Sequence, residues 1–208
     1  MKLTSSNIWF TSDTHYSHTN ICRGVSNWNN GNEADFAEST RDFADLESMN
    51  SAIVANINNC VDENDWLIHC GDWSFGGFDK IEEFREQINC KNIVLILGNH
   101  DHHIQNNKNN VQKLFTHVAH YEEMNITNKS NKQRLILCHY PIISWNNMNI
   151  GAFMIHGHQH LKGDCRFGEG KRMDIGMCGS PEFRPYHLDE IIEYLHARPS
   201  RERHPREK

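Results

Sequence analysis

No feature of this chain limits its possible folds as strongly as five short apolar runs that each stop at a polar cluster. The runs are typical of buried strands, and they end in the segments FTSDTH, HCGDW, LGNHD, LCHYP and HGHQH. In open α/β sheets the carboxyl ends of the strands face a common crevice, where ligands bind. The sequence therefore predicts an α/β fold in which five strand tips, each carrying Asp, Asn or His, meet at one site.

The first half of the chain alternates strands with helices, and the second half consists mostly of strands. Capping-box patterns begin at Asp35 and Asp79, and apolar residues follow both at helical spacing. They predict a long helix over residues 35–57 and a shorter one over 79–88. A last helix is expected at 188–197. The expected strands are 7–15, 65–72, 91–101, 118–127, 133–141, 152–160 and 172–179.

These elements suit a single domain over residues 1–198, with two sheets packed face to face between helices. At 208 residues with 38% hydrophobic content, the chain is long enough to bury a core. The segment 199–208 is charged and has no apolar anchor, so we expect it to form a disordered tail.

Charge and cysteine usage exclude several classes of function. The formal net charge of −6 argues against non-specific binding to nucleic acid or to an anionic membrane. No segment has the length and apolar content of a signal peptide or a membrane span. The seven cysteines are scattered without CxxC pairs, so we expect reduced thiols and a cytoplasmic location. The oligomeric state stays open.

The side chains at the five tips are of the kinds that bind divalent metal ions. Carboxylate, imidazole and amide oxygen, without thiolate, suit ions from Mn²⁺ through Fe²⁺ to Zn²⁺. Seven ligands exceed what one ion usually takes from a protein, so we expect two ions that share a bridging carboxylate. Gly71, Gly98 and Gly157 are expected to allow tight turns beside them. The candidate ligands are Asp13, His15, Asp72, Asn99, His139, His158 and His160.

The ordered set D-x-H, G-D, G-N-H-D, H and G-H-x-H resembles the calcineurin-like metallophosphoesterase superfamily, above all its small single-domain bacterial and phage members. The match runs from about Asn7 to Leu195 and includes the late strand RMDIG. The resemblance implies an α/β fold, a four-layer α/β/β/α sandwich with two mixed β-sheets, and a dimetal site at the carboxyl-terminal strand tips.

The resemblance also implies a role for each residue at the tips. His100 would be the catalytic group that faces the substrate phosphate, and Asp101 would hold its ring. A hydroxide that bridges the two metals would attack phosphorus. Mn²⁺ is the first expectation for both ions, with Fe²⁺, Zn²⁺ or Ni²⁺ as alternatives. The implied ligands are Asp13, His15, Asp72 and His160 for one ion, and Asp72, Asn99, His139 and His158 for the other.

The long segment after the first motif is an expected wall of the substrate site. His18, Asn20 and Arg23 follow that motif closely enough to reach the crevice, with Arg23 as a clamp for phosphate. A solvated loop explains the segment equally well. The same two interpretations apply to the basic residues after the last motif, which are Lys162, Arg166, Lys171 and Arg172.

The leading prediction is a dimetal-dependent phosphoester hydrolase, a phosphodiesterase or phosphomonoesterase, that acts on a nucleotide or another small phosphoester. A nuclease or a protein phosphatase is the first alternative, and the acidic net charge argues against the nuclease. A non-catalytic scaffold is the second alternative, because the superfamily contains retromer-type members whose site has decayed. The presence of His100 and of all the candidate ligands favours the enzyme over the scaffold.

Overall fold

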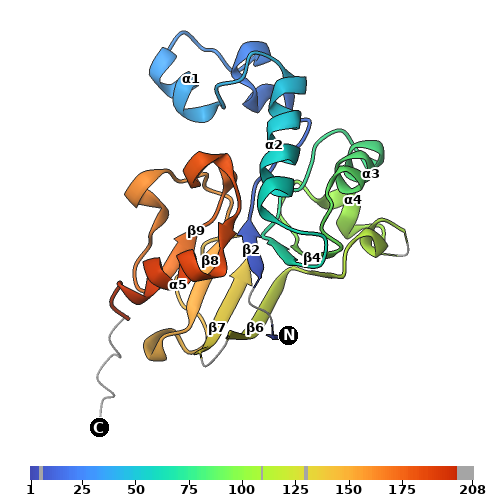
Figure 1. The fold of residues 1–208 in the computed structure, drawn as a ribbon. Helices are drawn as coiled ribbons and strands as arrows, with labels where there is room; N and C mark the ends of the chain where they lie inside the picture. The colour runs from blue at the N-terminus through green and yellow to red at the C-terminus, as the bar shows by residue number, and fades with distance from the viewer. Residues whose placement is uncertain (5–6, 109, 129–130, 201–208) are drawn as a thin grey trace.

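Two five-stranded mixed β-sheets, packed face to face, form the centre of the structure (Figure 1), so the predicted α/β fold with two mixed sheets is confirmed. A computed structural model describes residues 1–4, 7–108, 110–128 and 131–200. The first sheet has the order β10-β2-β3-β4-β5, and only β10 runs antiparallel to its neighbour. Its strands are β2 (Ile8–Thr11), β3 (Trp66–His69), β4 (Asn92–Ile96), β5 (His117–Ala119) and β10 (Tyr186–His187).

The second sheet has the order β1-β6-β7-β8-β9, in which β6 and β7 pair antiparallel and the other neighbours are parallel. Its strands are β1 (Lys2–Thr4), β6 (Tyr121–Asn128), β7 (Asn131–Cys138), β8 (Phe153–His156) and β9 (Arg172–Asp174). The space between the sheets is filled by fully buried apolar side chains from both, such as Phe10 and Val94 against Leu135 and Phe153. Burial of this surface is the main force that holds the two sheets together.

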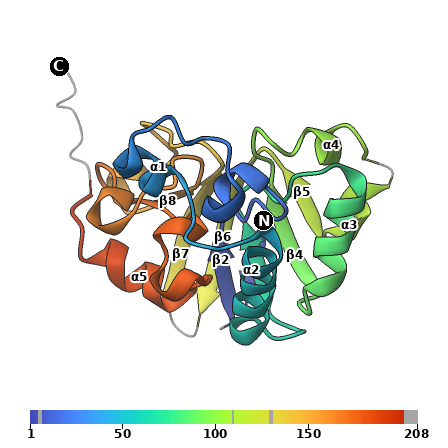
Figure 2. The same ribbon diagram turned by 90° about the horizontal axis from the view of Figure 1, so that it is seen from above.

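Helices cover the outer side of the first sheet and close one edge of the sandwich. Ile53 and Ile57 of α2 pack with Phe84 of α3 on that sheet, and Figure 2 shows α3 and α5 on opposite sides of the molecule. No helix in the described ranges is long and apolar enough to cross a membrane. The helices are α1 (Glu33–Ser39), α2 (Leu46–Cys60), α3 (Phe78–Gln87), α4 (His102–Gln105) and α5 (Leu188–His196).

The outer side of the second sheet is covered mainly by a loop. Trp145 and Met148, in the segment between β7 and β8, pack on Ile136 and Met154. Short 3₁₀ helices occur in this loop and in others. They span Thr19–Ile21, Arg23–Val25, Val111–Leu114, Met148–Ile150, Gly163–Arg166, Met177–Gly179 and Pro181–Phe183.

The predicted long helix over residues 35–57 is wrong, because the chain forms α1 and α2 with an extended segment between them. Thr40 has extended backbone angles, and the amide of Arg41 donates to the carbonyl of Ile21 instead of continuing a helix. Asp45 then caps α2 by accepting a hydrogen bond from the Ser48 amide. As a result α1 stands apart from both sheets (Figure 1).

Other predicted boundaries also differ. The side chain of Asn32, and not Asp35, caps α1, and α3 begins after Gly77, so Asp79 lies inside its first turn. The predicted strand 118–127 is two strands, because the chain leaves the first sheet after Ala119 and enters the second at Tyr121. Most of the predicted disordered tail, residues 201–208, lies outside the described residues.

Candidate metal centre

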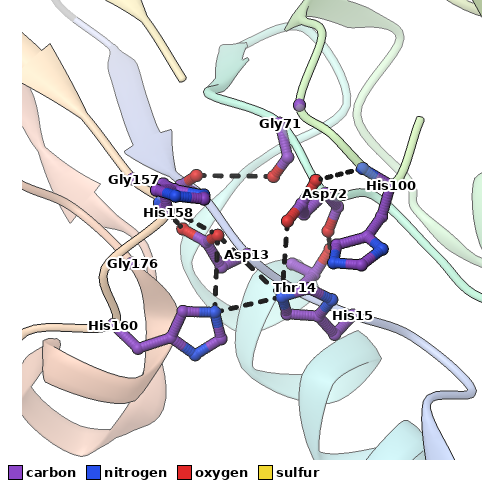
Figure 3. Close-up of polar contacts among 12 residues, drawn as sticks. Asp13, Thr14, His15, Gly71, Asp72, His100, Gly157, His158, His160 and Gly176 are labelled. Atoms are coloured by element: carbon purple, nitrogen blue, oxygen red, sulfur yellow. Dashed lines mark hydrogen bonds and ion pairs between the residues drawn. The ribbon is translucent and has the colours of Figure 1, made fainter. Parts of the chain in front are cut away.

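All seven predicted ligands come together where the tips of five strands meet. The loops after β2, β3 and β4 contribute residues from the first sheet, and the loops after β7 and β8 contribute residues from the second. Figure 3 shows Asp13, His15, Asp72, His158 and His160 around a common centre. The site therefore draws on both sheets, and it depends on their packing against each other.

Asp13, His15 and His160 form one group of converging ligand atoms. The Nε2 atom of His15 lies 3.1 Å from Nε2 of His160, which in turn lies 3.5 Å from Oδ1 of Asp13 (Figure 3). Nδ1 of His15 is buried and has no hydrogen-bond partner in the described part of the chain. Two imidazole nitrogens that face each other beside a carboxylate are the donor set of a divalent ion.

His139 is the centre of a second group, and its hydrogen bonds fix its tautomer. Nδ1 of His139 lies 2.8 Å from the carbonyl oxygen of Cys70; a carbonyl only accepts, so Nδ1 carries the proton. The unprotonated Nε2 then faces Oδ1 of Asn99 at 3.0 Å and Oδ2 of Asp72 at 3.5 Å. Nδ1 of His158 lies 3.0 Å from the same oxygen of Asn99. Lone pairs that converge without a proton between them suit a bound cation.

A carboxylate lies between the two groups, as a bridging ligand would. Oδ2 of Asp72 is 3.6 Å from Nε2 of His15 and 3.5 Å from Nε2 of His139. Its other oxygen accepts a hydrogen bond from the amide of His100. Asp13 also offers an atom to each group, so two carboxylates face the space between the imidazoles.

The electrostatics of the site favour cations. Burial raises the pKa of Asp13 to about 8, although His160 lowers it, and burial also raises the pKa of Asp72. Burial lowers the pKa of His139 to about 4, so its ring is neutral at physiological pH. A divalent ion binds neutral imidazole and ionised carboxylate, so an ion at this site would displace the proton that burial favours on Asp13 and supply the positive charge that the buried carboxylates need. The residues present therefore fit a metal centre.

Several of the candidate ligands have strained backbone conformations. The left-handed region, which favours glycine, costs an L-residue about 1–2 kcal/mol. Such strain persists at functional sites because the surrounding structure holds it. The residues are Asp13, His15, Asp72, His158 and His160, with φ of 54°, 47°, 58°, 73° and 52°.

The glycines beside the ligands are required for two different reasons. Gly71 has a φ of 97°, as predicted for a turn glycine. Gly98 has no such φ; instead, a Cβ there would lie 2.2 Å from Oδ1 of Asp72. A Cβ on Gly157 would lie equally close to Oδ2 of Asp13. The predicted turn freedom is thus wrong for Gly98 and Gly157, where close packing against a carboxylate excludes a side chain.

Comparison with known proteins agrees with this arrangement. The model of the calcineurin-like phosphoesterase family matches residues 6–174, which is most of the chain. The chain belongs to the calcineurin-like phosphoesterase family. Uncharacterized protein MJ1445 of Methanocaldococcus jannaschii is 27% identical to this phosphoesterase-family chain over 193 residues, which are 90% of each protein.

Two solved structures are also similar to this chain. The protein of unknown function AQ665 from Aquifex aeolicus has a TM-score of 0.63 at 22% identity, over 92% of this chain and all of its own. The similarity shows a common fold. A novel archaeal phosphodiesterase has a TM-score of 0.43 at 20% identity, over 83% of this chain and 86% of its own.

His100 and Asp101 occupy different environments in the structure. The His100 ring borders the open cleft and lies 4.7 Å from the Phe75 ring. The buried carboxylate of Asp101 accepts hydrogen bonds from the amides of Gly98, Asp72 and Trp73, at 2.8, 2.8 and 2.9 Å. In the described ranges it forms no hydrogen bond or ion pair with the His100 ring. Asp101 therefore joins the loop after β4 to the loop after β3. It does not hold the His100 ring, although the resemblance implied that role.

A cavity of about 990 Å³ opens beside the metal centre, between the segment 18–43 and the segment 159–183. His15, His100 and His160 border it on the side of the ligands. Trp28, which is 45% exposed, forms part of the opposite wall. The long segment after the first motif thus contributes a wall to the site, as expected.

The three predicted substrate contacts differ in their surroundings. The His18 ring lines the cavity and stacks on Phe75 with 3.7 Å between ring centroids. Arg23 also lines it, but its guanidinium donates to Thr40 and Ala37 and pairs with Asp42. Asn20 is not among the lining residues, and its side chain accepts a hydrogen bond from a nearby backbone amide of the same loop. Arg23 and Asn20 therefore stabilise the wall.

Of the four basic residues after the last motif, only Lys162 borders the cavity. Arg166 stacks on aromatic rings, including that of Phe167. Lys171 donates to carbonyls at the end of α5, and Arg172 donates to the carbonyl of Ile142. The last three are structural residues of the second half of the domain.

The sequence did not indicate Arg41 and Cys178 as members of the site. Arg41 is buried and donates to the carbonyls of Thr14 and Asp13, at 2.6 and 2.5 Å. It also donates to the sulfur of Cys178, at 3.3 Å, and that sulfur lies 3.4 Å from Nδ1 of His160. Arg41 falls inside the helix wrongly predicted over 35–57, and Cys178 has no motif around it, so only the fold brings them to the ligands.

Proposed function

We propose that this calcineurin-like phosphoesterase is a dimetal-dependent hydrolase of small phosphate mono- or diesters. The observation that carries the proposal is the placement of one Asp72 oxygen between the His15 and His139 rings, at 3.6 and 3.5 Å. Two divalent ions, when bound there, supply Lewis-acid activation of water and neutralise charge on the phosphoryl group. Mn²⁺ is the first choice, because carboxylate, imidazole and amide ligands all suit it.

The residues of this chain divide the remaining tasks among them. Asp13, His15, Asp72 and His160 hold one ion, and Asp72, Asn99, His139 and His158 hold the other. His100 donates a hydrogen bond or a proton to the phosphoryl or leaving oxygen, because its ring borders the cavity next to His15. The Asp72 carboxylate fixes the loop that carries His100 by accepting its amide hydrogen at 2.9 Å.

The cavity supports a small substrate with a planar group, such as a nucleotide. At about 990 Å³ it is much larger than a phosphate. The Trp28 ring is 45% exposed and meets the His18 ring edge to face, with 5.4 Å between centroids, so it offers a surface on which a base can stack. The walls carry Glu38 and Asp42 as well as the basic Lys162, so they offer both acceptors and a donor of hydrogen bonds to the rest of the substrate.

Hydrolysis assays with the Mn²⁺-loaded protein test the function. Nitrophenyl phosphate and bis-nitrophenyl phosphate should both be offered, followed by nucleoside monophosphates and cyclic nucleotides. His100→Ala should lower kcat by about 10²- to 10⁴-fold while both ions stay bound, because its ring is not a ligand. Absence of turnover on every ester, with two ions confirmed per chain, contradicts the proposal.

Measurements of nucleic-acid binding, substrate preference and partner binding separate the competing functions. A nuclease should bind single-stranded DNA or RNA with strong salt dependence, and a protein phosphatase should prefer phosphopeptides to nucleotides. A scaffold should bind its partner equally well after His100→Ala. The open cavity and the complete set of ligands favour the small-ester hydrolase over all three.

A further inference from the structure

His160 lies between the metal centre and a cysteine. Its Nε2 atom is directed at His15 and Asp13, as Figure 3 shows, at 3.1 and 3.5 Å. A ring that binds an ion through Nε2 must carry its proton on Nδ1. Nδ1 lies 3.4 Å from the sulfur of Cys178, so the Nδ1–H group has a sulfur acceptor.

Arg41 fixes the position of that sulfur. Its Nε donates to the Cys178 sulfur at 3.3 Å, and its two terminal nitrogens donate to the carbonyls of Asp13 and Thr14. The same guanidinium therefore ties the sulfur to the backbone of the first metal-site loop. Because Arg41 is only 6% exposed, this arrangement is rigid and shielded from water.

The two sides of the centre differ in what supports their imidazoles. His139 donates to a backbone carbonyl, that of Cys70, which no substitution of a side chain removes. Nδ1 of His15 has no partner in the described ranges. Cys178 is thus a side-chain acceptor behind a candidate ligand, in the place where proteins commonly use a carboxylate or a carbonyl.

We propose that Cys178 is a positioning residue of the metal centre: its sulfur accepts the Nδ1–H of His160 and thereby holds Nε2 toward His15 and Asp13. The inference rests on the proposed function only in requiring that ions bind at this centre. It predicts unequal effects on the two ions, because His160 belongs to the group with His15 and not to the group with His139.

Calorimetric titration of the metal-free protein with Mn²⁺ alone tests the proposal. Cys178→Ala should weaken one of the two sites by about 10- to 100-fold, the usual effect of losing an outer partner of a ligand, and leave the other unchanged. Cys178→Asp should restore the affinity, because a carboxylate accepts the same hydrogen bond. Cys165→Ala is the matched control, since Cys165 lines the same cavity and is exposed.

The absorption spectrum of bound Co²⁺ gives a second measurement, which should change for one site in Cys178→Ala and revert in Cys178→Asp. Unchanged affinity at both sites in Cys178→Ala overturns the proposal. A loss that Cys178→Asp does not restore also overturns it, because packing would then be the cause. If Cys178→Ala does not fold, Cys178→Val replaces it, because valine fills the volume of the cysteine without offering a hydrogen-bond acceptor. The same Mn²⁺ titration then tests the proposal. If the wild type and the Cys178 variants bind Mn²⁺ as expected here but no ester is hydrolysed, the proposed function is refuted and this inference stands.

Discussion

One oxygen of Asp72 lies close to two imidazoles, those of His15 and His139, as expected of a bridging ligand, and Asp13 is the other carboxylate that faces both groups. A side chain that serves a single ion affects that ion alone. A bridging carboxylate affects both, since each ion loses a ligand and the two positive charges lose the anion between them.

Asp72→Asn should therefore weaken both Mn²⁺ sites by more than the roughly 10- to 100-fold effect of an outer partner. His139→Ala should weaken only one site, and it serves as the comparison. Titration of the metal-free variants, followed by Mn²⁺ electron paramagnetic resonance, measures the two sites separately. Loss of one ion alone in Asp72→Asn would contradict the bridging role.

His69 is a buried residue behind the site, and its protonation should limit stability in acid. Burial and His139 lower the pKa of His69 to about 3. Its Nδ1 accepts a hydrogen bond from the Gly71 amide, so Nε2–H donates to Thr14. A second proton on Nδ1 would break the first bond. The unfolded chain binds this proton near pH 6.5, so stability is complete above that pH and falls as the pH falls toward 3.

From pH 7 to pH 5 the His69 contribution should amount to about 2 kcal/mol of unfolding free energy. His69→Asn should lose correspondingly less stability over this interval than the wild type. Urea unfolding of the metal-free proteins at both pH values measures the difference. His120→Asn, a change at an exposed histidine, should behave like the wild type, and equal losses in all three proteins would refute the assignment.

Helix ends show where local sequence patterns succeed and where tertiary structure overrides them. The apolar spacing was sufficient to predict helical structure in α2 and α3, because their buried faces follow from the period of the helix, but it did not indicate where α2 begins. The break between α1 and α2 was not predictable, since it depends on pairing of Arg41 with the loop at Ile21. That contact joins segments whose proximity only the fold determines.

The strand tips were predictable for a related reason. Each polar cluster follows an apolar run, and parallel strands place their carboxyl ends together, so the sequence indicated the meeting of Asp13, Asp72 and Asn99. The change of sheet between Ala119 and Tyr121 carries no such local signal, because both sides of the change have the composition of a strand.

One observed cap, Asp45, and one expected cap, Asp79, give a direct test at helix ends. Asp45 caps α2 through the Ser48 amide at 2.7 Å, whereas Asp79 lies within the first turn of α3 and forms no cap. Asp45→Ala should lower the Tm by about 2–4 °C, the effect of losing an N-cap in a domain of this size. Asp79→Ala should lower it less, and differential scanning calorimetry measures both. A larger effect at Asp79 would contradict the observed start of α3.

Across the whole molecule, the candidate metal centre lies where the two sheets meet at one end of the sandwich. Its candidate ligands follow β2, β3 and β4 on one side and β7 and β8 on the other. Ions that bind there are bound only by the assembled fold, so their binding free energy adds to the stability of the entire domain.

Removal of the ions by a chelator should therefore lower the Tm of the whole domain in a single transition. With each ion present at about 1,000 times its Kd, the loss should be roughly 10 °C or more. Thermal unfolding with and without chelator measures the shift. His100→Ala should show the same shift as the wild type, and a Tm unaffected by the chelator would refute the presence of the metal centre.

The left-handed backbone at Asp13, His15, Asp72, His158 and His160 has a consequence for the evolution of such chains. Each of these residues lowers the stability of the metal-free fold by about 1 kcal/mol, and glycine in its place would remove that cost together with the ligand. Selection for activity keeps these residues against a continuous pressure toward stability. When that selection ends, substitutions that remove the ligands and stabilise the sandwich should spread first. The fold can therefore persist after the activity is lost.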